Sequence, residues 1–420
     1  MDRPRIVVTG IGIISPLGHT AEESWASLLA GRSGIGPITQ IDSCMLPIHF
    51  AGEIRDFDPG DYMSFKEARR MSRASQLAVA ALAMALQDAG LNVPVADAER
   101  LGTVIGTGAG GLEVADRELL KLRERGFKAV SPFALTGFLP NMPSYHVSLV
   151  TGAHGPINTV VAACASGALA IADGADWIRH GRADVVIAGG TEGLIHDTSL
   201  AAFARMNALS LRNNDPATAC RPFDLMRDGT VISEGAGIVV LESLAHAHAR
   251  NAPILGEIMG SASAADAFHV AAPDPEAAGA ARAMRWALAD ARVLPESIDY
   301  INAHGTATPA NDVQETTAIK KVFGERAYEI PVSSSKAVLG HAMGGTGAIE
   351  AIFCLQAMRD GIIPPTWNYT TPDPECDLEY VPNAPRPARL RTVMSNSFAM
   401  GGHNTSLVLG DAELETRGSW

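Results

Sequence analysis

The chain of 420 residues contains few cysteines, few aromatic side chains and no long apolar run. No run approaches the ~18 apolar residues that a membrane-spanning helix needs, and the amino terminus lacks the apolar core of a signal sequence, so we expect no membrane partner. The net charge of −13 argues against nucleic acid as a main partner. The five cysteines form no CxxC pair and no disulfide framework, which favours a reducing, cytoplasmic location.

What the chain does contain is an alternation of short β-branched runs and Ala-rich amphipathic segments, typical of an α/β fold with mixed sheets covered by helices. Strands are expected at 5–10, 101–106, 184–190, 237–241, 298–303 and 331–334, with a terminal hairpin at 391–397 and 404–409. Helices are expected at 22–29, 69–89, 165–180, 280–291 and 345–358.

A helix–link–strand pattern occurs twice. Residues 81–90 lead through a proline-containing link to the strand at 101–106, and residues 282–291 lead through Pro295 to the strand at 298–303. The repetition predicts a duplicated core in which two sheets share a layer of helices. We expect one half at 1–250, a second at 251–412 and a short tail at 413–420.

The stretch from Val160 to Ala168 is the strongest candidate for a nucleophile. A β-branched run, expected to be a buried strand, ends in small residues around Cys164, and a helical segment follows directly. Small neighbours permit the sharp turn of a nucleophile elbow, and a helix amino terminus favours the thiolate. The alternative is a buried structural cysteine.

Two histidines occupy comparable positions. His304 follows the strand at 298–303, and His341 precedes a glycine-rich helix start; ligands bind at that edge of α/β sheets. A lone histidine is usually structural. The functional interpretation therefore rests on the fact that Cys164, His304 and His341 all lie among small residues at the ends of expected strands. Residues 106–111 match GxGxxG, the motif of a dinucleotide-binding site, but the second strand ending in an acid that such a site needs does not follow. We therefore interpret these glycines as positions where the backbone approaches another segment closely.

The chain resembles the β-ketoacyl-[acyl-carrier-protein] synthases of the condensing-enzyme (thiolase-fold) family, and most closely the synthase II branch. The resemblance runs nearly end to end. It rests on Ala163–Gly167, Arg221–Asp224, Gly235–Gly237, Asn302–Thr306 and Lys336–His341. It implies a thiolase-like fold with α-β-α-β-α layers and a 3-oxoacyl-[acyl-carrier-protein] synthase, which joins a malonyl unit to a Cys-bound acyl chain with loss of CO2.

The resemblance also implies roles for individual residues. Cys164, His304 and His341 would form the catalytic triad, with a Lys336–Glu315 pair that orients His341 and tunes its protonation. The oxyanion and gate turn would contain Phe398 and Met400, with the backbone N–H groups of Cys164 and Met400 as oxyanion donors, and Thr306 and Thr308 would contact the pantetheine arm. The resemblance implies no metal and no organic cofactor.

The implied partners are an acyl carrier protein, loaded with acyl or malonyl groups, and a second copy of the chain, joined through the sheet of the N-terminal half. Carrier proteins are very acidic, so this acidic chain needs a local basic patch. Candidate carrier-binding residues cluster at the start of the helix expected at 69–89 and beyond it: Lys66, Arg69, Arg70, Arg73 and Lys128. A merely solvated helix face is the alternative.

Two positions depart from the family pattern. Met400 stands where a gating phenylalanine is usual, and Ala109 stands where a bulkier aliphatic residue is common, which together predict a looser and roomier acyl pocket. These departures keep open a ketosynthase of a type II polyketide or polyene pathway. A thiolase and a non-catalytic chain-length factor are disfavoured by the retained cysteine and paired histidines, and a serine hydrolase by the lack of GxSxG.

Overall fold

The computed structural model describes residues 3–412, and its main feature is one ten-stranded sheet that runs through both halves of the chain. The order across it is β10-β9-β13-β14-β8-β1-β7-β6-β4-β5. The N-terminal strands are β1 (Ile6–Ile14), β4 (Leu101–Gly106), β5 (Ile157–Val160), β6 (Val185–Glu192) and β7 (Gly235–Ser243). The C-terminal strands are β8 (Gly256–Ala265), β9 (Tyr300–Asn302), β10 (Val332–Ser333), β13 (Thr392–Ala399) and β14 (His403–Gly410).

The two halves of this sheet repeat one topology. From the centre outward, the N-terminal half reads β1-β7-β6-β4-β5 and the C-terminal half reads β8-β14-β13-β9-β10. In each half the successive pairings are antiparallel, antiparallel, parallel and parallel. The predicted duplication is therefore confirmed, although the expected two sheets are continuous because β1 and β8 pair at the centre.

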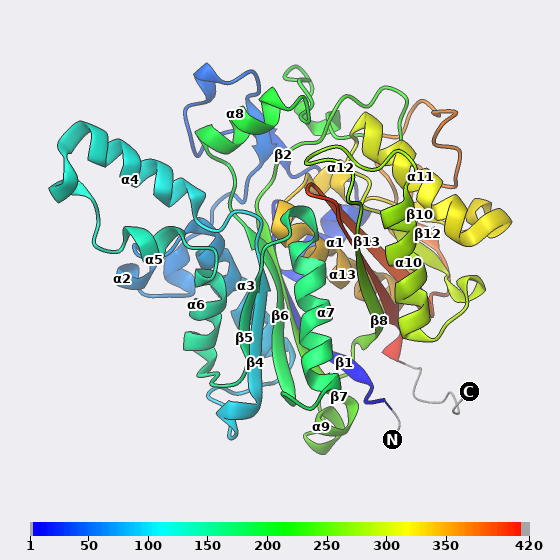
Figure 1. Ribbon diagram of the computed structural model, residues 1–420, viewed down its shortest axis with the longest axis horizontal. Coiled ribbons are helices and arrows are strands. Elements are labelled where there is room, and N and C mark those ends of the chain that lie inside the picture. Colours follow the sequence, from blue (N-terminus) through cyan, green and yellow to red (C-terminus); the bar gives the residue numbers. More distant parts are fainter. Residues whose placement is uncertain (1–2, 413–420) are drawn as a thin grey trace.

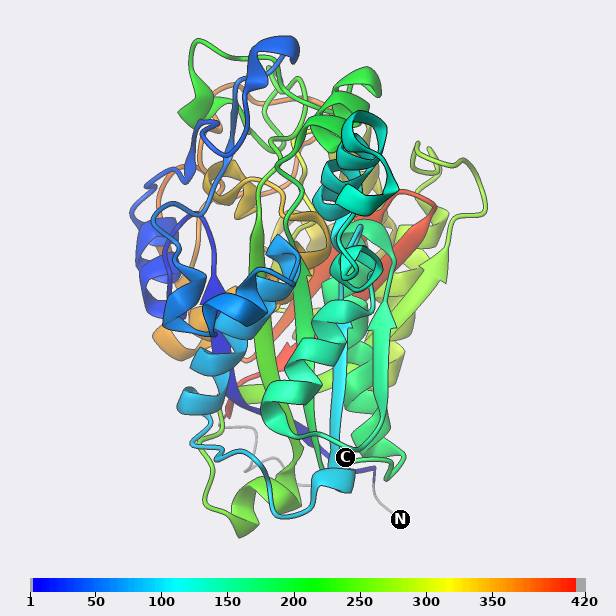
Figure 2. The same cartoon turned by 90° about the vertical axis from the view of Figure 1, so that its left-hand side faces the viewer.

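Helices form three layers around the strands. Helices α3 (Arg73–Asp88) and α6 (Met142–Thr151) cover the outer face of the N-terminal half, and α10 (Ala278–Ala291) and α11 (Pro309–Phe323) lie on the C-terminal side. Between the halves, α7 (Ser166–Arg179) packs against α13 (Met343–Asp360) (Figure 1). Figure 2 shows α3 and α6 in front of the strands of the N-terminal half. The largest core cluster joins α7 and α13 to strands of both halves, which confirms the predicted shared layer.

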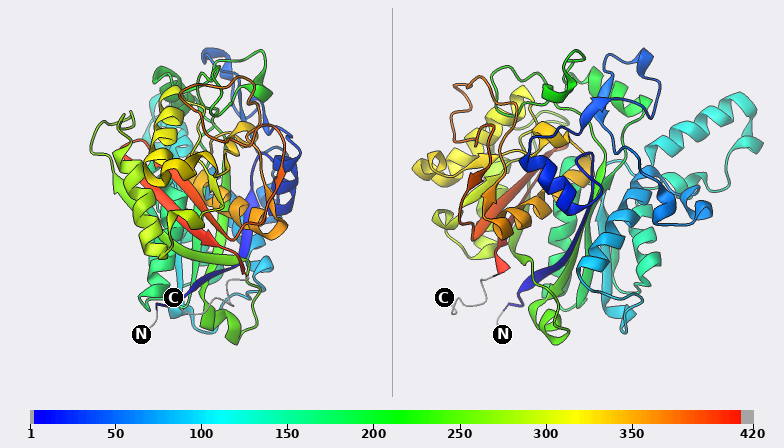
Figure 3. Two further views of the ribbon diagram at one scale, coloured as in Figure 1. Left: turned by 90° about the vertical axis from the view of Figure 1, so that its right-hand side faces the viewer. Right: turned by 180° about the vertical axis from the view of Figure 1, so that it is seen from behind.

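The remaining helices lie at the ends and edges of the sheet. They are α1 (Ala21–Leu29), α2 (Phe65–Ala68), α4 (Leu112–Arg125), α5 (Ala134–Phe138), α8 (Asp197–Arg205), α9 (Leu244–Ala249) and α12 (Lys336–Leu339). Helix α4 projects from the body above α5 and α2 (Figures 1 and 3). Across residues 3–412, no helix has both the length and the apolar character needed to cross a bilayer.

Two local predictions were wrong. The helix expected at 69–89 begins at Arg73, because Ser64 caps the separate short helix α2 and Ser72 caps α3. The strand before Cys164 was expected to be buried, but β5 pairs only with β4 at the sheet edge, and Ile157 and the following Val161 are 54% and 53% exposed.

Candidate active site

Cys164 lies in a tight turn between the edge strand β5 and helix α7. The turn is a single 3₁₀ segment, Ala163–Ala165, and Ala163 adopts the uncommon left-handed backbone with φ of 46°. Gly106 at the end of β4 leaves room for this turn, since a Cβ there would lie 2.2 Å from the carbonyl oxygen of Ser166. The structure thus has the sharp strand–turn–helix geometry predicted for a nucleophile, and the glycines of residues 106–111 serve close backbone approach.

The protonation state predicted for Cys164 was wrong. Burial raises the pKa of the Cys164 thiol to about 12, outweighing the Lys336 charge and two backbone N–H groups that lower it. Those N–H groups belong to Met400 and to Cys164 itself, and both hydrogen-bond the sulfur. The resting side chain is therefore a thiol, and two N–H donors already converge where an oxyanion would form beside it.

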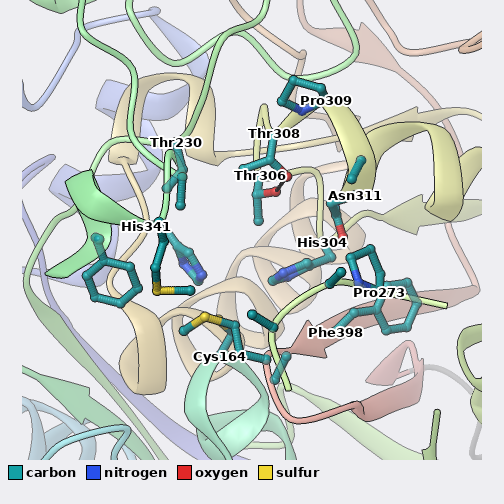
Figure 4. A pocket seen from close by; sticks show the side chains of 18 of the residues that line it. Cys164, Thr230, Pro273, His304, Thr306, Thr308, Pro309, Asn311, His341 and Phe398 are labelled. Carbon is teal, nitrogen blue, oxygen red and sulfur yellow. Dashed lines mark hydrogen bonds between the residues drawn. The ribbon is translucent and has the colours of Figure 1, made fainter. Parts of the chain in front are cut away.

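His304 and His341 lie opposite this sulfur. One side-chain donor atom from each of Cys164, His304 and His341 falls within 4.8 Å of the other two. The two imidazole rings are 5.5 Å apart between centroids and nearly perpendicular, at 80° (Figure 4). The structure thus brings together the three residues that the sequence proposed as a triad.

Both imidazoles are neutral at neutral pH. Burial, followed by the charge of Lys336, lowers the pKa of His304 and of His341 well below the usual value. The Nδ1 atom of His341 lies 3.0 Å from the hydroxyl of Thr346. When that hydroxyl donates to Nδ1, the ring proton resides on Nε2, a buried atom without a hydrogen-bond partner in the described chain.

The predicted ion pair between Lys336 and Glu315 was wrong. Lys336 Nζ lies 2.6 Å from Glu350 Oε1 on α13, and neither side chain is exposed. Glu315 instead accepts the backbone N–H groups of His304 and Gly305, at 2.8 and 2.7 Å. Glu350 could have been suspected from the sequence, because a lone carboxylate in an otherwise apolar helix requires a buried partner.

A pocket of about 420 Å³ opens onto Cys164, His304 and His341. Thr306 and Thr308 line it, with their hydroxyls 2.9 Å apart (Figure 4). Phe398 and Met400 also line it, but they differ in position: the Phe398 ring packs 5.9 Å from the ring of His304, whereas Met400 lies nearer the cysteine.

Behind the cysteine lies an apolar cluster that contains Cys164 and Met343, with Phe203, Ala109 and Met400 packed against it. The Met343 sulfur is 3.9 Å from the cysteine sulfur. Met343 was not predicted as a site residue, and a methionine at the first position of a helix gives no sequence signal. Ala109 therefore packs against the apolar cluster that contains Cys164.

The predicted carrier-binding residues divide into two groups. Lys66 and Lys128 are exposed on α2 and on the turn after α4, and Arg69 and Arg70 line a groove with the unpredicted Arg117 and Lys121 of α4. Arg70 also stacks 4.1 Å from the ring of Phe133. Arg73 differs from the others, because its guanidinium forms a 2.8 Å ion pair with the buried Glu234.

The cysteine and two histidines also have the ligand types that Zn²⁺ prefers. Three ligands would leave one coordination position open, as in catalytic zinc sites. The charge of Lys336, which lowers the pKa of both histidines, opposes a cation at this position. A thiol with a raised pKa binds a metal only on losing its proton.

The model of the β-ketoacyl synthase N-terminal domain matches residues 3–247, and that of the C-terminal domain matches residues 255–370. The chain belongs to the β-ketoacyl synthase family. Synthase relatives match nearly the full length. The 3-oxoacyl-[acyl-carrier-protein] synthase 2 of Synechocystis is 47% identical over 97% of this chain and 98% of its own, and that of Coxiella burnetii is 44% identical over 97% and 99%.

Solved ketosynthase structures share the whole fold. The ishigamide ketosynthase/chain length factor superposes with a TM-score of 0.92 and 38% identity, covering 98% of this chain and 100% of the other. A type II polyketide ketosynthase solved in complex with its acyl carrier protein, AntDE:AntF, gives a TM-score of 0.91 and 32% identity with the same coverage. The thiolase-like architecture expected from the sequence is thereby confirmed.

Proposed function

We propose that this β-ketoacyl synthase is a 3-oxoacyl-[acyl-carrier-protein] synthase that extends an acyl chain held on Cys164. The observation that carries the proposal is the convergence of one thiol and two neutral imidazoles on a single pocket. A neutral imidazole can donate a hydrogen bond to developing negative charge without repelling an adjacent proton donor. The full-length similarity to synthases of this activity supports the same reading.

In the first half-reaction, Cys164 attacks the thioester of an acyl carrier. The sulfur–carbonyl bond to Cys164 forms, the bond to the carrier sulfur breaks, and the thiol proton leaves on the carrier thiol. The N–H groups of Cys164 and Met400 stabilise the tetrahedral oxyanion. Sulfur suits this exchange because one thioester replaces another.

In the second half-reaction, a malonyl thioester loses CO2 and leaves an enolate. His304 and His341 donate hydrogen bonds to the enolate oxygen. The enolate carbon then attacks the Cys164 thioester, a carbon–carbon bond forms, and the Cys164 sulfur departs as a thiolate that takes up a proton from solvent. The product is a 3-oxoacyl chain on the carrier, longer by two carbons. Thr306 and Thr308 line the side of the pocket by which the pantetheine arm would enter.

The partner that delivers both substrates is an acyl carrier protein. Lys66, Arg69, Arg70 and Lys128 supply positive charge on and around α2 and α4 of an otherwise acidic chain. Long-range attraction of this kind weakens with salt. Reversing the charge at Arg69 and Arg70 is expected to weaken carrier binding at low salt; unchanged binding there would contradict the patch.

A second copy of the chain is the proposed partner at the edge of β5. The edge strand exposes unpaired backbone groups together with apolar side chains, and such an edge invites pairing with another strand. Ile157 and Val161 on this edge and Leu149 and Val150 on the adjacent α6 are all exposed. We place this homodimer in the cytoplasm. Sedimentation of the purified chain tests whether it is a dimer.

A type II polyketide or polyene ketosynthase is the second candidate. It is favoured by Met400 beside the cysteine and by the similarity to the ishigamide ketosynthase. The chemistry would be the same and the acyl substrate different. Acyl carriers of graded length and unsaturation separate the two candidates, because a fatty acid synthase prefers saturated chains.

The test of the proposed activity is direct. Incubation with an acyl carrier is expected to add the acyl mass to the peptide that contains Cys164, and malonyl carrier is then expected to release a 3-oxoacyl carrier. The Cys164→Ala variant is the control and should show neither. If the wild-type chain forms no adduct and no product, the proposed function is wrong.

A further inference from the structure

A third buried carboxylate, which the mechanism above does not use, lies next to the nucleophile. Glu192 ends strand β6 and has no exposed surface. It accepts hydrogen bonds from Gly108 N at 2.6 Å, Thr107 Oγ1 at 3.1 Å and, more weakly, Ala109 N at 3.4 Å. It also accepts one from Gly344 N at 3.1 Å. Its hydrogen bonds therefore all go to backbone or hydroxyl donors rather than to a cation.

The four donors come from two segments that flank Cys164. Thr107, Gly108 and Ala109 form the loop after β4, and Ala109 borders the apolar cluster behind the cysteine. Gly344 is the second residue of α13 and follows Met343, whose sulfur lies 3.9 Å from that of Cys164. Glu192 thus ties the loop after β4 to the start of α13, and both segments border the apolar cluster that contains Cys164.

The loop after β4 and the start of α13 are in close backbone contact. A Cβ on Gly344 would lie 2.5 Å from the backbone nitrogen of Gly108, and a Cβ on Gly108 would lie 2.7 Å from Glu192 Oε2. Glycine is required at both positions for this approach. Such a contact between two N–H-rich backbone segments needs an acceptor between them, and the Glu192 carboxylate is that acceptor.

The duplicated fold gives Glu192 a counterpart. Strands β4 and β9 occupy the same place in the two halves of the sheet, second from the outer edge. Glu192 holds the loop after β4, and Glu315 holds the loop after β9 through the N–H groups of His304 and Gly305. One buried carboxylate therefore fixes the cysteine side of the site, and the other fixes the histidine side.

From this arrangement we propose that Glu192 is a positioning residue for acyl transfer to Cys164, acting by holding Ala109 and Met343 in place at the apolar cluster beside the cysteine, where the acyl chain would lie. The proposal rests on the proposed synthase function. Glu192 does not touch the reacting atoms. It fixes the backbone of Ala109 and Gly344, next to the apolar cluster that would receive the acyl chain. Its removal should therefore impair acyl transfer and leave malonyl decarboxylation intact.

The experiment separates the two half-reactions in the wild type, Glu192→Gln and Glu315→Gln. An amide at 192 places N–H donors against N–H donors, which loosens the loop. We expect Glu192→Gln to lower kcat/KM for transfer of a long acyl chain by about 10-fold or more, in keeping with the cost of small misplacements at a reacting centre. Acetyl transfer should fall less, and malonyl decarboxylation should stay within about twofold. Glu315→Gln should show the opposite division.

Asp299→Asn is the matched control. Asp299 accepts the backbone N–H groups of Arg391 and Thr392, at 2.7 and 3.1 Å, just before the starts of β9 and β13 and at the opposite end of these strands from the site. It should change neither half-reaction. If Glu192→Gln does not fold, as judged by its melting transition, Glu192→Asp replaces it, because this variant keeps the charge and shortens the reach.

The outcomes distinguish the two levels of inference. Equal loss of both half-reactions in the Glu192 variant, or no loss of long-chain transfer, would overturn the positioning role. A wild-type chain that performs neither half-reaction would overturn the synthase function itself. A selective loss of acyl transfer that grows with chain length supports both.

Discussion

Lys336 and Glu350 form an ion pair, with 2.6 Å between Nζ and Oε1, in which neither side chain reaches solvent. The hydroxyl of Ser335 also donates to the same Glu350 oxygen, at 3.0 Å. The pair joins the short helix α12 to α13, and His341 lies on the link between them. A buried pair of this kind costs desolvation energy, so the loss of one partner is more harmful than the loss of both.

The first prediction concerns stability. Lys336→Met alone or Glu350→Leu alone should lower the free energy of unfolding by about 3–5 kcal/mol, because each leaves an uncompensated buried charge. The double variant Lys336→Met/Glu350→Leu should recover most of that loss. Urea unfolding of the four proteins measures the coupling. Additive losses in the double variant would contradict a direct buried pair.

The second prediction concerns the acid limb of malonyl decarboxylation. The Lys336 charge lowers the pKa of both His304 and His341, so its removal should raise both values toward the ordinary one. The protonated forms then appear at higher pH, and the acid limb of the rate profile should move upward. The double variant above is the protein to use, since it carries no orphaned charge. An acid limb at the wild-type position would contradict the electrostatic role of Lys336.

The fold and the three central residues were predictable because each leaves a local sequence signature. Cys164 lies where a strand, a turn of small residues and a helix follow one another, and the helix–link–strand repeat indicates the duplication. Glu350 was missed although it lies only 14 residues from its lysine, because the resemblance assigned that lysine to Glu315. Glu192 was missed because it holds backbone N–H groups from distant segments, which no residue type reveals. The thiolate was wrongly predicted for a different reason. Spacing shows the helix terminus but not the desolvation that outweighs it.

The third prediction concerns the reactivity of Cys164 in the absence of substrate. Because burial raises the pKa of the thiol, the thiolate fraction at neutral pH is small, and alkylation by iodoacetamide should accelerate steadily from pH 7 to pH 9. Mass spectrometry of the peptide that contains Cys164 follows the rate, and the Cys164→Ala variant identifies labelling of the exposed Cys44. A rate that levels off below pH 8 would indicate a stabilised thiolate.

The fourth prediction concerns metal ions. Cys164, His304 and His341 present nitrogen and sulfur donors within 4.8 Å of one another, but the synthase chemistry proposed here uses them without a metal. Pretreatment with EDTA should leave condensation unchanged. Added Zn²⁺ should inhibit by occupying the same donors, and it should protect Cys164 from alkylation. Loss of activity on chelation, restored by Zn²⁺, would contradict the proposed mechanism.

The fifth prediction concerns the pH dependence of stability that Glu192 creates. Burial raises the pKa of the Glu192 carboxyl from its ordinary 4.5 to about 7, against the hydrogen bonds that lower it. Between these values the folded chain binds this proton and the unfolded chain does not, so the contribution of Glu192 to stability falls as pH rises from about 4.5 to about 7. Above pH 7 both states are ionised and the contribution is constant.

Glu192→Gln removes this titration. The wild-type free energy of unfolding minus that of the variant should therefore decrease by up to about 3 kcal/mol between pH 5 and pH 7, at 1.36 kcal/mol for each pKa unit. It should then stay level from pH 7.5 to pH 9. Urea unfolding at each pH measures the difference, in which the other titrating groups cancel because both proteins share them. The constant offset above pH 7.5 reports the lost hydrogen bonds, whereas the slope below pH 7 reports the buried charge. A difference that does not vary from pH 5 to pH 9 would mean that Glu192 is ionised throughout, and that its four donors outweigh its burial.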